Sequence, residues 1–459
     1  MNINNKISSI CLLTLSVACI NLQSCSTKAI SESKTKSAKS KTEVDKLNGN
    51  SIASTFDIDK IEFKDKTYVN DIYTVRLYKK GWELGDPSIQ LGAGEQLELH
   101  FDEMRTEYTN YQYKVIHCNY DWTKSTLNEM EYIEGFNDNY IEYHEPSFNT
   151  NQDYIHYAVV FPNEQIKLVK SGNYLVMVYV EGNDDIPIIT KRFYVTENAF
   201  GIKGNVKYPS DVEDRYYKQE VDFDLTINPS EITNPYENIK VIIEQNHRPD
   251  NISSDLIPNF VKENQLIYNY DDKNVFEAGN EYRHLDLTNT QSRTTHVYEF
   301  EHIGDTLHGY MLNDLKRQFK QYMQYEDVNG RYVTRNVNSS DAFLESEYVM
   351  LHFKMKCPRA FDDGDIYIFG EMSDYQYQER FKMTYDASIE AYTCAVYLKQ
   401  GYYNYNYVFV GPNETNLETV EGTHFDTEND YLFKVYYRDP TNFYDRLMLY
   451  KIVNSRDTF

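Results

Sequence analysis

The chain has 459 residues, and its 71 acidic against 46 basic residues give a formal net charge of -25 at pH 7. A chain this acidic has no electrostatic support for binding phosphate backbones, which excludes nucleic acid as a partner. Its 43 Tyr and 23 Phe, with short β-branched runs between Asn, Asp, Gly and Pro clusters, predict an all-β protein. At roughly 100 to 200 residues per domain, its length predicts three domains, with two or four as alternatives.

Residues 1–24 have the features of a secretory signal peptide. Lys6 supplies the positive charge, and an apolar stretch from Ile7 to Ile20 follows it, too short for a stable membrane span. The sequence Leu22-Gln23-Ser24-Cys25 resembles the bacterial lipoprotein box. The resemblance implies that Cys25 begins the mature chain and is the lipid attachment site.

The segment 25–56 is predicted to be an acylated cysteine followed by a flexible tether. Residues 26–50 are mostly Ser, Lys and Thr with almost no apolar side chains, so they cannot offset the entropy of becoming ordered. No acidic run follows Cys25. Similar lipoproteins that are sent to the cell surface carry such a run as an export signal. Its absence favours an outer-membrane lipoprotein on the periplasmic face over one at the cell surface.

The remaining cysteines are Cys118, Cys357 and Cys394. Three cysteines without close spacing form neither a disulfide framework nor a zinc site. The sequence does not decide whether Cys357 and Cys394 form a disulfide bond. We expect no metal, no cofactor and no catalytic residues.

The first folded segment, residues 57–198, reads as strands joined by turns and predicts an immunoglobulin-like β-sandwich. The expected strands are 72–78, 96–101, 111–118, 154–161, 172–180 and 189–195.

The second segment, residues 199–341, is predicted to be a further β-rich domain. Its clearest strand, 219–227, places Val221, Phe223, Leu225 and Ile227 on one face. Further strands are expected at 238–246, 264–270, 282–287 and 295–303. A short helix is an alternative for 312–323, because Leu312, Leu315 and Phe319 fall at helical spacing.

The third segment, residues 342–459, begins with a strand that places Val349, Leu351, Phe353 and Met355 on one face, and Cys357 is expected in the core beside them. Residues 365–411 resemble the early-set sandwich modules that include glycogen-binding domains. The shared features are an Ile-Phe-Gly strand end, a Met-x-Tyr-Asp turn and a closing Gly-Tyr-x-x-Tyr-x-Tyr strand. The fold class is therefore all-β, with tandem immunoglobulin-like and early-set β-sandwich domains.

The stretch "VIHCNYDWTKS" (115–125) brings an imidazole, a thiol and a carboxylate close together in sequence. If 111–118 is a strand, its side chains alternate, so His117 and Cys118 point to opposite faces. A Cys-His catalytic pair needs hydrogen-bond reach, which these positions deny. Asp121 is expected to begin a turn.

The same region carries a resemblance to a known family. "YKVIHCNYDWTKSTLNEMEYIEGFNDNYI", "RFYVTEN", "YPSDVEDRYYKQEVDF", "NVFEAGNEYRHLDL" and "LKQGYYNYNYVF" occur in this order, and the chain resembles the plug proteins of the type IX secretion system over residues 68–455. The resemblance implies a non-enzymatic protein, a monomer within its complex, that docks on the periplasmic end of a large outer-membrane translocon barrel and blocks its channel.

Two alternative functions use other features of the sequence. A glycan-binding lipoprotein would use Tyr375, Tyr377 and Asn404 as its sugar site. An enzyme is the second alternative, but the sequence contains no Gly-x-Ser-x-Gly motif, Walker loop or His-Glu-x-x-His motif. His424 and Asp426 could bind a metal, but an isolated pair in a polar loop is usually solvated surface.

Overall fold

The computed structural model describes residues 61–438, 440–441 and 443–459, all of which belong to one compact unit, 58–459. The predicted signal segment, Cys25 and the predicted tether fall within residues 1–60, which lie outside the described residues. Within the described part, no helix has the length and apolar character needed to cross a membrane.

The first sandwich packs two sheets face to face over a core of apolar side chains. Phe161 of one sheet meets Phe193 of the other, with ring centres 5.4 Å apart. One sheet contains β1 (Lys66–Thr67), β12 (Pro187–Thr196), β11 (Gly172–Val180), β5 (Tyr111–Cys118) and β7 (Asn139–Tyr140), with β3 (Ser88–Gln90) parallel to β12. The other contains β2 (Ile72–Lys79), β4 (Leu97–Glu103), β9 (Ile155–Phe161) and β8 (Tyr143–Pro146). The pieces beside them are α1 (Glu129–Tyr132), β6 (Ile133–Gly135) and β10 (Ile166–Leu168).

The second sandwich combines residues after 200 with the C-terminal strands. Phe223 and Phe433 meet across its core, with ring centres 5.0 Å apart. One sheet contains β13 (Gly201–Lys207), β14 (Lys218–Thr226), β18 (Gln265–Tyr268), β17 (Phe260–Val261) and β19 (Val275–Glu277). The other contains β16 (Ile252–Ser253), β15 (Ile239–Gln245), β31 (Asp430–Arg438) and β32 (Asp445–Asn454), and α2 (Pro235–Asn238) precedes β15.

The third module is one connected sheet whose halves face each other, since Phe353 and Tyr405 lie 5.3 Å apart across its core. Its main path is β20 (Arg283–Asp286), β29 (Gly401–Val410), β26 (Asp365–Phe369), β27 (Lys382–Asp386), β28 (Ala391–Lys399), β25 (Tyr348–Lys356), β22 (Thr306–Met311) and β21 (Val297–Ile303). Added to it are β23 (Asp314–Leu315), β24 (Tyr332–Thr334), β30 (Thr415–Asn416), α3 (Glu418–Glu421) and the 3-10 turns Glu371–Ser373 and Glu379–Phe381.

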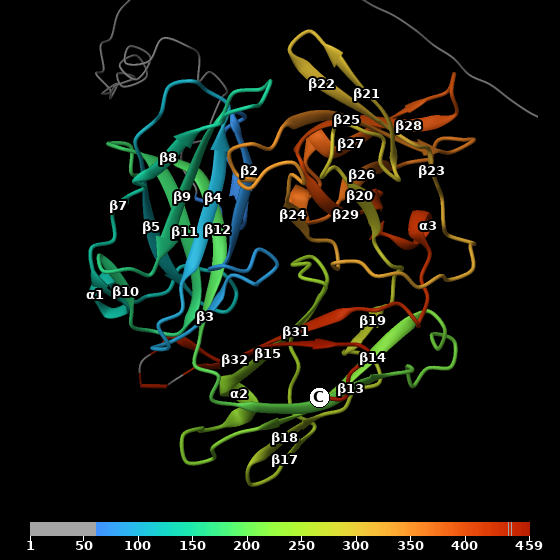
Figure 1. Cartoon of the computed structure of the whole chain (residues 1–459). Helices are drawn as coiled ribbons and strands as arrows, with labels where there is room; N and C mark the ends of the chain where they lie inside the picture. The colour runs from blue at the N-terminus through green and yellow to red at the C-terminus, as the bar shows by residue number, and fades with distance from the viewer. Residues whose placement is uncertain (1–60, 439, 442) are drawn as a thin grey trace, which may run out of the picture. The chain divides into compact units, whose positions relative to one another are not determined.

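The sheets do not follow the division predicted between residues 341 and 342. β15 of the second predicted segment pairs with β31 of the third, and β20 pairs with β29 in the same way. Figure 1 shows the red strands β31 and β32 lying beside β15, far from the orange strands that precede them in sequence. Pairing between distant strands leaves no local pattern, which is why sequence periodicity did not indicate it.

Other local predictions can be compared directly with the structure. β5 and β11 have the predicted bounds, and the alternating faces of β14 and β25 are confirmed. Cys357 lies in the core as expected, and Cys118, Cys357 and Cys394 are all free thiols.

The helix considered for residues 312–323 is not formed. Asp314 and Leu315 instead pair in parallel with the end of β25, and the backbone N–H groups of Arg317 and Gln318 both donate to the carbonyl of Val420. These contacts with distant strands outweigh the helical spacing of the apolar side chains.

Candidate functional site

His117 and Cys118 face different clusters, as the alternation of β5 predicted. The His117 ring packs against Tyr132 and Tyr174, and its Nε2 lies 3.1 Å from the carbonyl oxygen of Ser171. Cys118 lies in a separate apolar cluster with Ile116 and Leu175. Burial lowers the pKa of His117 to about 4 and raises the pKa of Cys118 to about 12. A buried neutral imidazole and a buried protonated thiol are structural groups.

The residues considered for sugar binding do not form an open aromatic surface. Tyr375 is buried against Phe369, and its hydroxyl donates to the carbonyl of Asn329 at 3.3 Å. Asn404 is buried, and its side-chain oxygen accepts the N–H of Val328. Tyr377 alone is partly exposed, and because a sugar-stacking site needs an accessible ring with polar groups around it, the three residues do not make one.

His424 and Asp426 do not belong to a metal centre of the described residues, where no group of three or more His, Cys, Asp or Glu could hold an ion. The His424 ring packs against Tyr322, with ring centres 5.6 Å apart, and burial lowers the pKa of this imidazole.

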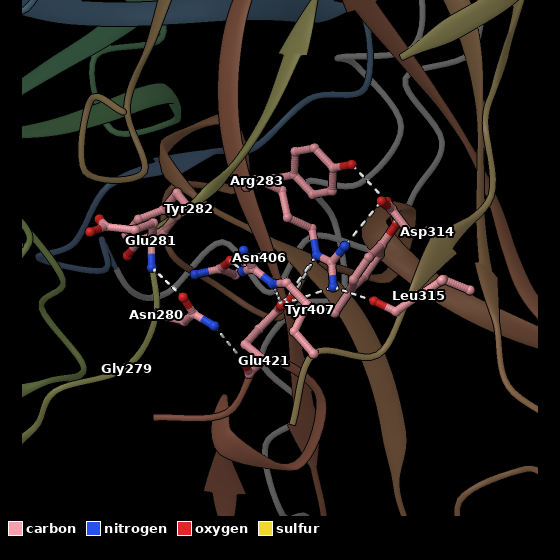
Figure 2. A network of polar contacts seen from close by, with 12 residues as sticks. Gly279, Asn280, Glu281, Tyr282, Arg283, Asp314, Leu315, Asn406, Tyr407 and Glu421 are labelled. Carbon is pink, nitrogen blue, oxygen red and sulfur yellow. Dashed lines mark hydrogen bonds and ion pairs between the residues drawn. The ribbon is translucent and has the colours of Figure 1, made fainter. Parts of the chain in front are cut away.

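A dense polar network lies in the third module, around the fully buried carboxylate of Glu421 (Figure 2). Arg283 binds it through Nε at 3.0 Å and Nη2 at 2.9 Å, and Arg317 Nε reaches it at 2.7 Å. The backbone N–H of Tyr407 also donates to it at 2.9 Å. Burial alone would raise the pKa of Glu421, but the two guanidinium groups outweigh burial and lower it to about 2.

A second carboxylate completes this network. Asp314 accepts a hydrogen bond from Arg283 Nη1 at 3.0 Å, and from the hydroxyls of Tyr405 and Tyr407 at 2.7 Å each. Arg283 also donates to the carbonyl of Leu315 at 2.8 Å. The charges therefore attach the segment after β22 to β20, β29 and α3.

A further buried network joins the first sandwich to the third module. Asp102 of β4 accepts from Lys399 Nζ of β28 at 2.7 Å and from the hydroxyl of Tyr348 at 2.6 Å. His156 Nδ1 lies 2.7 Å from its other oxygen. Burial alone would raise the pKa of Asp102, but Lys399 and His156 outweigh burial and hold it below its ordinary value. All four side chains are buried, so this contact fixes the two modules against each other.

Sequence reasoning missed both networks. The ion pair between Asp102 and Lys399 spans 297 residues, and the pair between Arg283 and Glu421 spans 138. The only local signal was a charge within or beside an apolar strand, as in "LELHFDE" for Asp102. Such a charge must be paired when buried, but the pattern does not identify its partner.

Comparisons with known proteins agree with the fold described above. The family model described as Type 9 secretion system plug protein 1st domain matches residues 72–197, which is the first sandwich. The crystal structure of a hypothetical protein from Parabacteroides merdae ATCC 43184 is similar, with 33% sequence identity and a TM-score of 0.83. The match covers 86% of this chain and 100% of that chain. No curated protein matches. The chain therefore belongs to the type 9 secretion system plug protein family.

Proposed function

We propose that this protein is a non-enzymatic component of type IX secretion that docks on the periplasmic end of the outer-membrane translocon barrel and blocks its channel. The observation that carries the proposal is the family match over residues 72–197. The fold supports it, because the sandwich that carries the match is joined to the third module by a buried ion pair. A pore wide enough for folded cargo would leak when idle, and a stopper for it has to keep its shape.

The proposal includes an outer-membrane lipoprotein on the periplasmic face, with acylated Cys25 as the anchor and the barrel as the partner. An anchored stopper stays near its pore after cargo displaces it, since the tether raises its local concentration. A single acyl chain gives only marginal binding, whereas several give a stable anchor.

Deleting the gene tests the blocking role. The outer membrane should become permeable to large antibiotics that it normally excludes, while the amount of barrel stays unchanged and secretion falls only in part. Restoring the full chain should reseal the membrane, and deleting the barrel as well should abolish the leak. An impermeable deletion strain that still contains an otherwise empty barrel would show that the protein is not a stopper.

A further inference from the structure

Four large apolar side chains project from one short stretch, residues 312–323, between β22 and β24. Leu312 is 52% exposed, Leu315 50%, Phe319 92% and Met323 72%. In Figure 1 this part of the chain includes β23 and continues along the outer side of the third module past α3. We call residues 312–323 the apolar loop.

The apolar loop is held in place from beneath. Asp314 and Arg317 point inward to the Arg283 and Glu421 network, and the backbone of Arg317 and Gln318 is bonded to Val420. Near its end, the hydroxyl of Tyr322 donates to the carbonyl of Asp426 at 2.9 Å. The exposed side chains therefore stand on a fixed backbone, which lowers the entropy lost when they bind a surface.

The charges at the surface of the apolar loop are basic, although the whole chain carries -25. Lys316 and Lys320 form no ion pair among the described residues, and Lys316 Nζ lies 4.6 Å from the ring centre of Phe361. The one acidic residue of the loop, Asp314, is used by the inward network. Some exposed apolar side chains elsewhere have acidic neighbours instead, as Val212 does between Asp211 and Glu213.

We propose that the apolar loop inserts into the headgroup region of an anionic phospholipid surface. Phe, Leu and Met enter the boundary of the acyl chains while lysines contact the phosphates, which is the chemistry of interfacial membrane binding. A protein partner is less well matched, because lysine is depleted at protein interfaces. The proposal goes beyond plugging and does not depend on it, since the membrane contact requires no barrel.

Vesicle co-sedimentation tests this with the chain from residue 26 to 459, so that neither the acyl groups nor the apolar stretch Ile7–Ile20 contributes. The protein should bind vesicles containing phosphatidylglycerol more strongly than vesicles of phosphatidylcholine alone. Raising the salt from about 0.1 M to about 1 M shortens the screening length from about 10 Å to about 3 Å and should weaken binding. The double variant Phe319→Ser/Lys320→Glu should bind the anionic vesicles at least about tenfold more weakly.

The β17–β18 hairpin offers a matched control. It presents Phe260, 66% exposed, and exposed Lys262, so Phe260→Ser/Lys262→Glu makes the same chemical changes elsewhere. This control should bind vesicles as the parent does. The proposal is wrong if the parent does not bind anionic vesicles, or if both double variants lose binding equally. Capture of the barrel through Phe319 without any vesicle binding would assign the loop to a protein partner instead and would also overturn it.

Discussion

Replacing Lys399 by Met should destabilise the protein strongly, because it removes one partner of a buried ion pair. The Lys399 ammonium is buried, binds Asp102 at 2.7 Å and the carbonyl of Phe343 at 2.6 Å, and lies 4.2 Å from the ring centre of Tyr154. Met fills a similar volume but leaves the Asp102 carboxylate without its cation. Breaking a buried pair from one side costs about 3–5 kcal/mol.

Urea denaturation followed by tryptophan fluorescence measures this loss. Both tryptophans, Trp82 and Trp122, lie in the first sandwich, on one side of the broken contact. Combining Lys399→Met with Asp102→Asn should cost less than the sum of the two single changes, since no charge is then left unpaired.

An exposed pair provides the control for this change. Lys167 lies 3.5 Å from Glu134, with 59% and 67% of their side chains exposed, so Lys167→Met should change the free energy of unfolding by less than about 1 kcal/mol. If Lys399→Met also costs less than about 1 kcal/mol, the buried pair does not stabilise the contact between the modules, and the reasoning fails.

Three further changes test separate features. The pKa of Glu421 is about 2 in the folded protein against an ordinary 4.5, so the carboxylate contributes about 3 kcal/mol of stability above pH 4.5, and this contribution is lost as the pH falls towards 2. Glu421→Gln should therefore flatten the plot of unfolding free energy against pH between pH 4.5 and 2. An unchanged plot would contradict the assignment. Cys118→Ser should cost about 1–3 kcal/mol in denaturation by placing a hydroxyl in an apolar cluster, and wild-type stability with lost barrel binding would indicate a functional thiol. Mass spectrometry of the mature N-terminal peptide should show acylated Cys25, and Cys25→Ala should release the protein from the membrane fraction, whereas an unmodified N-terminus at another residue would refute the lipoprotein assignment.

Sequence periodicity predicted the parts of the fold that depend on neighbouring residues. The alternation of Val221, Phe223 and Leu225 reflects burial on one face of a single strand, and that face is a local property. The outcome for residues 312–323 differs because Arg317 is bound to Glu421, more than 100 residues later, and this contact outweighs a weak helical preference. The buried ion pairs share this origin: each charge is visible in the sequence, but its partner is set only by strand pairing.

Sequence periodicity also did not predict that the side chains of the apolar loop are exposed. Leu312, Leu315 and Phe319 have the spacing of a core-facing helix, yet the structure exposes all three. Apolar spacing indicates which side chains lie together, but it does not distinguish a buried face from one that awaits a partner. Here the hydrogen bonds of Asp314, Arg317 and Gln318 hold the backbone of the loop so that its apolar side chains face solvent.

The pairing of β31 with β15, and of β32 with β31, delays the completion of the second sandwich during synthesis of the chain. β15 ends at residue 245 and its partner β31 begins only at residue 430. Because the N-terminus emerges first, the first sandwich and then the third module can fold before β31 is available. Until then, the edge of β15 that pairs with β31 stays unpaired and can aggregate. A premature stop codon after the third module would therefore remove few residues yet leave the second sandwich without two strands of one sheet. Such a truncated chain should aggregate through that open edge.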